Sequence, residues 1–247
     1  MWKEEKMNKE KILGFNVSTY SSEKLLNKLF EDYFNNEQLF IVNVNPEIVV
    51  NNYKNDKFKE ILNNQKYQIP DGSGIVWASK RKKSKIKERI TGIDLMLKIC
   101  EKSQEYSSKV YLYGSTQEVI EKAQEELVKV YPKINIVGYC NGYIDENEAM
   151  EKIKKSGADI LFVGLGSPKQ EEFIIKYKEE LEKTKILMPV GGSFDVISKT
   201  KRRAPNWVIK INLEWLYRLL QEPKRVFRQT KLLKFICLVL GEKNGKN

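Results

Sequence analysis

The chain has 247 residues, of which 41% are hydrophobic, and its 44 Lys and Arg residues exceed its 33 Asp and Glu residues to give a net charge of +11. This length and composition suit one large globular domain, or a domain with an appendage. Because the chain contains no histidine, it has no Ser-His-Asp or Cys-His nucleophile system, no His-ligated zinc and no imidazole acid–base catalysis. Proton transfer would therefore fall to carboxylates, Lys, Tyr or Cys.

Cysteine spacing and hydropathy exclude further classes of protein. Cys100, Cys140 and Cys237 are too far apart for a Cys-x-x-Cys motif, so we expect neither a disulfide framework nor a zinc ribbon, and a reducing compartment fits. Residues 1–6 include acids and no apolar core, which predicts no signal peptide. The longest apolar run of the tail, residues 235–240, is far shorter than the roughly 20 residues of a membrane-spanning helix, so we expect no transmembrane segment.

The first half of the chain has an irregular hydrophobic pattern. It predicts strands at 12–17, 39–44 and 67–70, and helices at 22–33, 46–52 and 93–100. Residues 80–89 hold seven basic residues and one acid, a composition that predicts a mobile, exposed loop.

From Lys109 onwards, short apolar runs alternate with helical periods. The pattern predicts strands at 110–113, 134–137, 160–163 and 186–190, and helices at 116–130, 146–156 and 169–182. Such alternation is typical of the α/β class with a doubly wound sheet. We therefore predict a Rossmann-like, mostly parallel sheet with helices on both faces, and a ligand site at the carboxyl ends of its strands.

The positive charge is concentrated near the C-terminal end. Residues 199–247 contain 13 basic and 3 acidic residues, a net charge of +10, so residues 1–198 carry only +1. We therefore predict an α/β domain over 1–198 and a helical, cationic, amphipathic appendage over 199–247. The asymmetry indicates a polyanionic partner, either nucleic acid or an anionic membrane surface. A basic tail that serves only solubility is the alternative.

The tail has the pattern of an amphipathic helix. A helix over 224–240 places one set of residues on an apolar side, namely Val226, Leu233, Ile236, Cys237 and Leu240, and a second set on the opposite, basic side, namely Lys224, Arg228, Lys231 and Lys234. This pattern is typical of a helix in a membrane interface, where the upstream Trp207 and Trp215 would also be favoured. An ordinary amphipathic helix packed against the body would show the same pattern.

Two predicted strand ends carry small residues that let a backbone approach a phosphate. Gly114, Ser115 and Thr116 follow one strand, and the run Gly-Leu-Gly-Ser-Pro-Lys-Gln-Glu at 164–171 follows another. The second run offers free N–H groups at a helix start with a lysine beside them. It is neither a P-loop nor a GxGxxG motif, and its glycines are equally compatible with a plain turn. A third turn, Gly-Gly-Ser-Phe-Asp at 191–195, belongs to the same edge.

Asp71 is the best candidate for proton transfer. It follows an apolar strand and precedes Gly72 and Gly74, so it lies at a strand end with room for a ligand against its backbone. An aspartate that only caps a turn or a helix is the alternative. The chain has no Asp-x-Asp motif, so the charge of a leaving diphosphate would be met by Arg, Lys and helix N-termini.

Eight short motifs occur in order along the chain. They are Asn-Pro-Glu-Ile-Val (45–49), Pro-Asp-Gly-Ser-Gly-Ile-Val (70–76), Glu-Arg-Ile-Thr-Gly-Ile-Asp (88–94), Leu-Tyr-Gly-Ser (112–115), Val-Gly-Leu-Gly-Ser-Pro-Lys-Gln-Glu (163–171), Gly-Gly-Ser-Phe-Asp (191–195), Arg-Ala-Pro-Asn-Trp (203–207) and Leu-Glu-Trp-Leu-Tyr-Arg-Leu-Leu-Gln-Glu-Pro-Lys-Arg (213–225). Together they resemble the WecG/TagA/CpsF family of bacterial glycosyltransferases, and the resemblance spans about residues 12–235.

The resemblance implies an inverting, metal-independent hexosyltransferase that needs no cofactor. It would move N-acetylmannosamine from UDP-ManNAc to the C4 hydroxyl of GlcNAc-diphospho-undecaprenol, in the synthesis of teichoic acid or a related surface polysaccharide. Its implied partners are the UDP-sugar donor, the lipid-linked acceptor and an anionic membrane surface, with a homo-oligomer possible and no nucleic acid. Its implied location is peripheral, on the cytoplasmic face of the plasma membrane.

The resemblance also implies roles for individual residues. The family's proposed general base falls on Asp71, Asn43 lies close to the site, and arginines that would close over the diphosphate fall on Arg225 and Arg228. The implied substrate-binding residues are Asn45, Arg89, Thr91, Asp94, Gly114, Ser115, Gly164, Gly166, Pro168, Lys169, Gln170, Glu171, Asp195 and Arg218. Asn43 departs from teichoic-acid members of the family, which carry Thr there. An amide still hydrogen-bonds a sugar hydroxyl or acetamido group, and another donor, such as the uronic acid UDP-ManNAcA, is an alternative.

Two other classes of protein remain as alternatives. One is a nucleic-acid-binding protein whose basic tail tracks phosphates, although the apolar side of the tail is large for a purely electrostatic arm and no RNA-stacking motif is present. The other is a regulatory nucleotide-binding subunit without turnover. Release of UDP from a donor in the presence of a lipid-linked acceptor would exclude this subunit.

Overall fold

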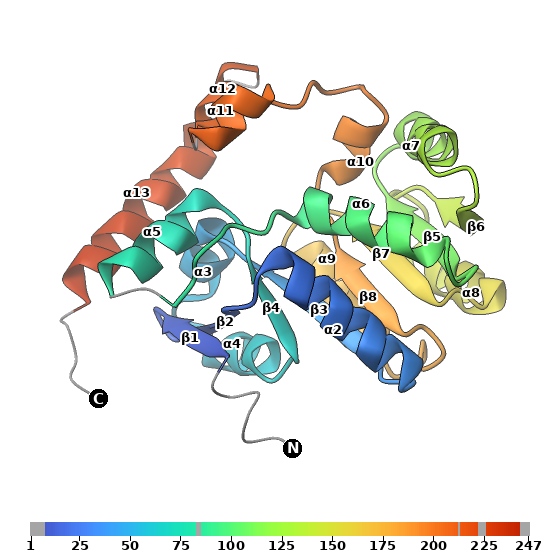
Figure 1. Cartoon of the computed structure of the whole chain (residues 1–247), viewed down its shortest axis with the longest axis horizontal. Coiled ribbons are helices and arrows are strands. Elements are labelled where there is room, and N and C mark those ends of the chain that lie inside the picture. Colours follow the sequence, from blue (N-terminus) through green and yellow to red (C-terminus); the bar gives the residue numbers. More distant parts are fainter. Residues whose placement is uncertain (1–7, 83–84, 212, 222–225, 243–247) are drawn as a thin grey trace.

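A six-stranded parallel sheet forms the centre of the computed structural model (Figure 1). The structure describes residues 8–82, 85–211, 213–221 and 226–242. In spatial order, the strands are β4 (Tyr67–Pro70), β3 (Leu39–Val44), β8 (Ile186–Pro189), β7 (Ile160–Gly164), β5 (Lys109–Gly114) and β6 (Asn135–Cys140). Every neighbouring pair is parallel, so all six carboxyl ends lie at one edge, and the predicted fold class is confirmed.

Apolar side chains on both faces of the strands build two cores. In β3, Phe40 and Val42 belong to one core, whereas Leu39 and Ile41 belong to the other, as the two-residue period of a strand requires. Because both faces are buried, helices must cover both of them.

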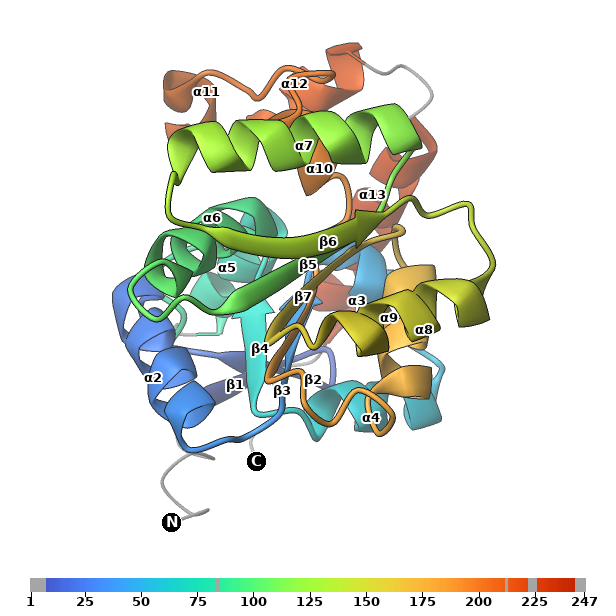
Figure 2. The same ribbon diagram turned by 90° about the vertical axis from the view of Figure 1, so that its right-hand side faces the viewer.

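Helices cover each face of the sheet, and Figure 2 shows α6 and α7 on one side and α8 and α9 on the other. The core of the first face includes residues of α2 (Ser22–Phe34), α6 (Gly92–Ser103), α7 (Gln117–Val130) and α10 (Ser193–Ile197). The core of the second face includes residues of α3 (Pro46–Asn52), α4 (Asp56–Asn63), α5 (Ser73–Arg81), α8 (Glu146–Ser156), α9 (Lys169–Tyr177) and α13 (Val226–Gly241).

Several predicted elements differ from the structure. The strand expected at 12–17 is an antiparallel hairpin of β1 (Lys9–Ile12) and β2 (Phe15–Ser18), because Leu13 and Gly14 adopt positive φ angles of 49° and 86° and turn the chain. Helix α4 was not predicted. The loop expected at 80–89 is wrong in part, since α5 runs to Arg81 and Ile86 is 1% exposed in the core.

The C-terminal helices are α11 (Asn206–Lys210), α12 (Glu214–Gln221) and α13, and Figure 1 shows α13 running beside α5. Helix α13 packs against α3 and α5, and it buries Phe235 and Val239 in the core of the second face. The side predicted to be apolar faces outward instead, because Leu233 and Leu240 are 64% and 50% exposed. Helix α13 therefore has apolar residues on two opposite sides.

Candidate active site

The carboxyl ends of all six strands open into one cavity of about 1140 Å³. Each strand, or the loop directly after it, contributes to the lining: Asn45 after β3, Asp71 after β4, Ser115 after β5, Gly142 after β6, Gly164 at the end of β7 and Gly191 after β8. The cavity therefore lies where the sequence predicted a ligand site in a sheet of this kind.

Asp71 lies half-buried in the lining of this cavity. Its backbone N–H donates to the carbonyl oxygens of Val44, at 2.9 Å, and Ile69, at 3.0 Å, so the end of β4 fixes its position. Gly72 follows with φ of 102°, a conformation that favours glycine, and helix α5 starts at the next residue. The backbone of Asp71 is thus held between a strand end and a helix start.

Asn43 lies in the same cavity wall, on the neighbouring strand β3. Its side chain is buried, and its Nδ2 donates to the carbonyl oxygen of Pro189 at 2.7 Å. This bond ties β3 to β8 at the edge of the sheet. Its Oδ1 is buried without a hydrogen-bond partner in the described structure, so Asn43 still has an acceptor available for a hydroxyl or an amide.

Two nine-residue helices, α5 and α9, begin at this cavity without a side-chain cap. At the starts of α5 and α9, Gly72 and Pro168 occupy the N-cap positions and provide no side-chain hydrogen bond. Uncapped N–H groups favour an anion, and exposed Lys169 begins α9 and lines the cavity. Asn45 and Thr91, by contrast, use their side-chain oxygens to cap α3 and α6.

Glycines allow the ends of β5, β6 and β7 to approach closely. A Cβ atom on Gly114 would lie 2.4 Å from the carbonyl oxygen of Gly164, and one on Gly142 would lie 3.2 Å from the Cα of Gly114. Ser115 then adopts a positive φ of 56°. Gly164, Gly166 and Ser115 line the cavity, whereas the close contact with Gly164 gives Gly114 a packing role.

Gln170 and Glu171 behave differently although they are adjacent. Gln170 lines the cavity, accepts a hydrogen bond at Oε1 from the Gly191 N–H at 3.0 Å, and donates from Nε2 to Glu171 Oε1 at 2.8 Å. Glu171 is fully buried beneath it, and this burial raises the pKa of its carboxyl. Glu171 therefore holds Gln170 and the turn after β8 in place.

Two further charged residues mark the side of the cavity near α6. Arg89 lines the main cavity and also a neighbouring one of about 380 Å³, and its guanidinium pairs with Glu214 of α12. Asp94 lies in the smaller cavity, accepts from Thr91 Oγ1 at 2.5 Å, and pairs with Arg203 at 2.5 Å. Burial opposes ionisation of Asp94, but the hydrogen bonds from Thr91 and Arg203 outweigh it and lower its pKa.

The chain after residue 198 supplies part of the cavity wall. Lys201, Glu214, Trp215 and Leu232 all line it, and Lys201 lies 3.5 Å from the carboxylate of Asp195, another lining residue. Arg225 lies outside the described residues, as do the side chains of Arg218 and Arg228.

Several residues of this wall were not predicted. Glu214 was part of a quoted motif but was given no role, and Trp215 was expected only in a membrane interface, whereas it lines the cavity. The 141–143 turn was missed because β6 was expected to end at Val137, whereas it runs to Cys140. The Asn-Gly pair at 141–142 was a usable signal, since this dipeptide marks turns.

The fold and the site together define an α/β protein whose cavity lies at the carboxyl edge of a parallel sheet, the edge at which proteins of this class bind their ligands. The model of the glycosyl transferase WecG/TagA/CpsF family matches residues 10–247, and the chain belongs to this family.

Curated relatives carry one shared name. The chain is 38% identical over 247 residues to the N-acetylglucosaminyldiphosphoundecaprenol N-acetyl-beta-D-mannosaminyltransferase of Staphylococcus aureus strain MW2, covering 97% of this chain and 96% of that one. It is 38% identical over 206 residues to the protein of the same name from Bacillus spizizenii, covering 83% and 80% of the two chains. No helix in the described part of the chain has the length and apolar character needed to span a membrane.

Proposed function

We propose that this protein transfers N-acetylmannosamine from UDP-ManNAc to the C4 hydroxyl of GlcNAc on undecaprenyl diphosphate, with inversion and without a metal. The observation that carries the proposal is the position of Asp71 in the cavity that the ends of all six strands line. The family membership supports a glycosyl transfer, and the name of the S. aureus relative supports this donor sugar and acceptor.

In the proposed reaction, the carboxylate of Asp71 accepts the proton of the acceptor hydroxyl. The acceptor oxygen forms a bond to the anomeric carbon on the face opposite UDP, while the bond between that carbon and the phosphate oxygen breaks. UDP leaves with the electron pair of that bond. Inversion follows from attack on the opposite face, since no covalent enzyme intermediate is formed.

The diphosphate would lie at the start of α9. The Gln170 N–H already donates to the Gly166 carbonyl oxygen, but the backbone N–H and the ammonium of Lys169 offer positive charge there, and such groups stabilise a leaving anion without a metal. The start of α5 offers a second set of N–H groups beside Asp71. Arg225 and Arg228 would add charge-assisted hydrogen bonds if they close over the site.

Release of UDP, measured with UDP-ManNAc and a GlcNAc-diphospholipid of short chain, tests this proposal. We expect Asp71→Asn to lower the rate by about 10²- to 10⁴-fold, the range for loss of a general base, with an unchanged thermal unfolding curve. Asp56→Asn, at an exposed carboxylate on α4, is the matched control. A near-normal rate for Asp71→Asn would remove the base assignment, and absence of UDP release by the intact protein would remove the function.

A panel of UDP-sugars in the same UDP-release assay would identify the donor sugar. Asn43 lines the cavity and its buried Oδ1 has no hydrogen-bond partner among the described residues, so an acetamido N–H or a hydroxyl of the donor would supply one. We expect UDP-ManNAc to be used in preference to UDP-ManNAcA and UDP-GlcNAc. Preference for the uronate would support the alternative donor within the same family.

We also propose that the appendage, residues 199–247, docks on the membrane that carries the acceptor. Trp207, Trp215 and Leu220 of α11 and α12 are exposed. We define the outer face of α13 as Leu233, Ile236, Cys237 and Leu240. Leu233 and Leu240 of this face are also exposed. Exposed indoles and aliphatic residues of this kind favour a bilayer interface. The location expected for this enzyme is the cytoplasmic face of the plasma membrane.

Vesicle binding tests this docking with substitutions at two exposed residues of α13, which leave the buried Phe235 in place. We expect Leu233→Gln with Leu240→Gln to weaken binding to phosphatidylcholine vesicles by about tenfold or more, because two aliphatic side chains no longer leave water. Val128→Gln with Val130→Gln, at exposed positions on α7, is the matched control. Equal binding of both variants would refute docking through α13.

A further inference from the structure

The proposed reaction leaves one group of basic residues without a role. Lys80 and Arg81 lie in the last turn of α5, and Lys85 and Lys87 follow shortly after; we call these four residues the 80–87 cluster. All four are exposed, and none forms an ion pair within the residues that the structure describes. Like charges that form no ion pair repel one another, so these four cations favour an anionic partner.

The cluster is fixed to the body of the protein. Ile86 is 1% exposed in the core, and its N–H donates to Ser79 Oγ at 3.2 Å. The Lys85 N–H donates to Glu10 Oε2 at 3.1 Å. Lys85 and Ile86 are therefore anchored to the β1–β2 hairpin and to α5, and Lys80 and Arg81 belong to α5 itself.

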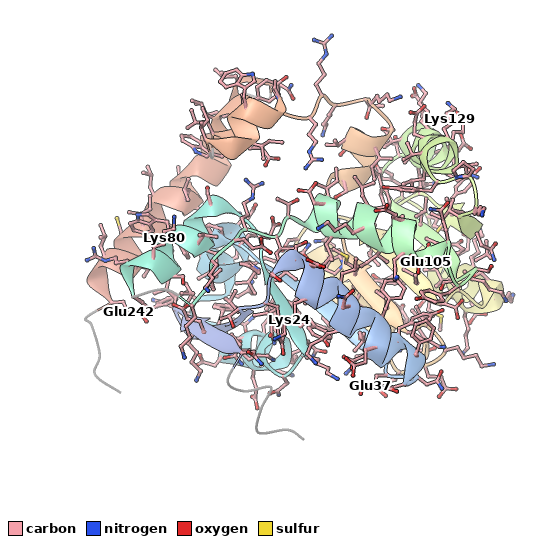
Figure 3. All side chains as sticks on the ribbon, viewed as in Figure 1. Lys24, Glu37, Lys80, Glu105, Lys129 and Glu242 are labelled. Atoms are coloured by element: carbon pink, nitrogen blue, oxygen red, sulfur yellow. The ribbon has the colours of Figure 1, made fainter. Side chains whose placement is uncertain are left out.

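The cluster adjoins the C-terminal end of α13. Helix α5 packs against α13, and Lys82 bridges the two helix ends through an ion pair with Glu242 at 2.6 Å. Figure 3 shows Lys80 and Glu242 at the same end of the molecule. One turn before the cluster, Trp77 of α5 is 39% exposed, and a Trp beside Lys and Arg is a combination that membrane interfaces favour.

The exposed apolar residues of α5 and α13 distinguish between two anionic partners, a nucleic acid and a bilayer. A nucleic acid would neutralise the cations but would leave Trp77, Leu233 and Leu240 in water. An anionic bilayer accommodates both, because its headgroups meet the cations and its acyl region receives the apolar side chains.

We propose that the 80–87 cluster is a second membrane contact, located on the catalytic body, that binds anionic phospholipid headgroups beside α13. This inference rests on the proposed function, because it assumes that the outer face of α13 meets a bilayer. It also has a consequence for the site: α5 begins directly after Asp71 and Gly72 and ends at the cluster. One short helix would then join the proposed base to the bilayer surface.

Charge-neutral substitutions test the contact on the full-length protein. The test variant is Lys80→Gln, Arg81→Gln, Lys85→Gln and Lys87→Gln together. The matched control removes four exposed lysines that precede strands β6, β7 and β8: Lys133→Gln, Lys154→Gln, Lys155→Gln and Lys183→Gln. Both variants change the net charge equally, and their thermal unfolding curves show whether they are folded.

Sedimentation with vesicles of phosphatidylglycerol and phosphatidylcholine is the measurement. At 0.1 M salt we expect the test variant to bind anionic vesicles at least about tenfold more weakly than the control, since each basic residue near such a surface adds about fivefold. The difference should vanish on pure phosphatidylcholine and shrink at 0.5 M salt. Equal binding of both variants to anionic vesicles would overturn the proposal.

The same experiment separates this proposal from the proposed function. Vesicle binding needs no turnover, and UDP release with a short-chain acceptor needs no vesicle. A missing turnover in the intact protein would refute the transferase, and an intact turnover with no difference between the two variants would refute only the cluster.

Discussion

The ion pair between Arg89 and Glu214 joins α12 to the cavity wall, and its removal should be costly. The Arg89 side chain is 17% exposed and that of Glu214 is 7% exposed. Removing one partner of a buried pair leaves the other charge uncompensated and costs about 3–5 kcal/mol. We expect Glu214→Gln to cost about 3 kcal/mol of unfolding free energy, the lower end of that range, because the remaining Arg89 keeps some contact with water.

The reciprocal substitution at Arg89 and the double variant complete a double-mutant cycle, which measures the coupling between the two side chains. Arg89→Gln removes a charge-assisted hydrogen bond to Glu214 and should cost about 2 kcal/mol, whereas the double variant should fall short of the sum by about 1–2 kcal/mol. Urea unfolding followed by tryptophan fluorescence measures all three, since Trp207 and Trp215 lie close to this pair in the sequence. Glu118→Gln, whose partner Lys122 is exposed, should change little. Losses that simply add would refute a coupled pair.

Three further outcomes follow from the same geometry. Phe235→Ala should destabilise the protein by about 3–5 kcal/mol, because Phe235 is fully buried where α13 meets the core; a change below about 1 kcal/mol in urea unfolding would show that α13 does not dock there. Burial raises the pKa of Glu171, so the folded protein keeps a proton that the unfolded chain releases, and stability should fall as the pH rises from the ordinary carboxyl pKa to the raised one. Glu171→Gln should remove that slope, whereas Glu125→Gln, at an exposed carboxylate, should leave it. Turnover should change by less than about twofold in EDTA, and a loss that Mn²⁺ restores would refute the metal-independent reaction.

The sheet was predictable because its strands are buried on both faces. Runs such as those of β3, β4 and β8 are almost wholly apolar, which strongly indicates a strand between helices. The sequence pattern predicted one strand in place of the hairpin at 9–18, because Leu13 and Gly14 form a turn that does not interrupt the apolar pattern. Helix α4 was missed because it contributes only Leu62 to the core as a buried residue.

The candidate site was predictable to the extent that it lies next to strand ends. Asp71, Ser115, Gly164 and Lys169 meet in one cavity, as residues at the carboxyl edge of a parallel sheet must. The partners of α13 were not predictable, because a helical pattern shows which side is apolar and not which side is covered. Phe235 and Val239 are buried, whereas the side with the clearer apolar pattern faces outward.

Three ion pairs join the appendage to the walls of the two cavities. Arg203 pairs with Asp94, Glu214 with Arg89 and Lys231 with Glu47, and on the body side Arg89 and Glu47 line the main cavity while Asp94 lines its neighbour. Movement of the appendage would therefore change the charges in the wall of the cavity. A bilayer that binds the outer face of α13 and the 80–87 cluster would hold the appendage against the body, and so keep that wall closed where the lipid-linked acceptor is found.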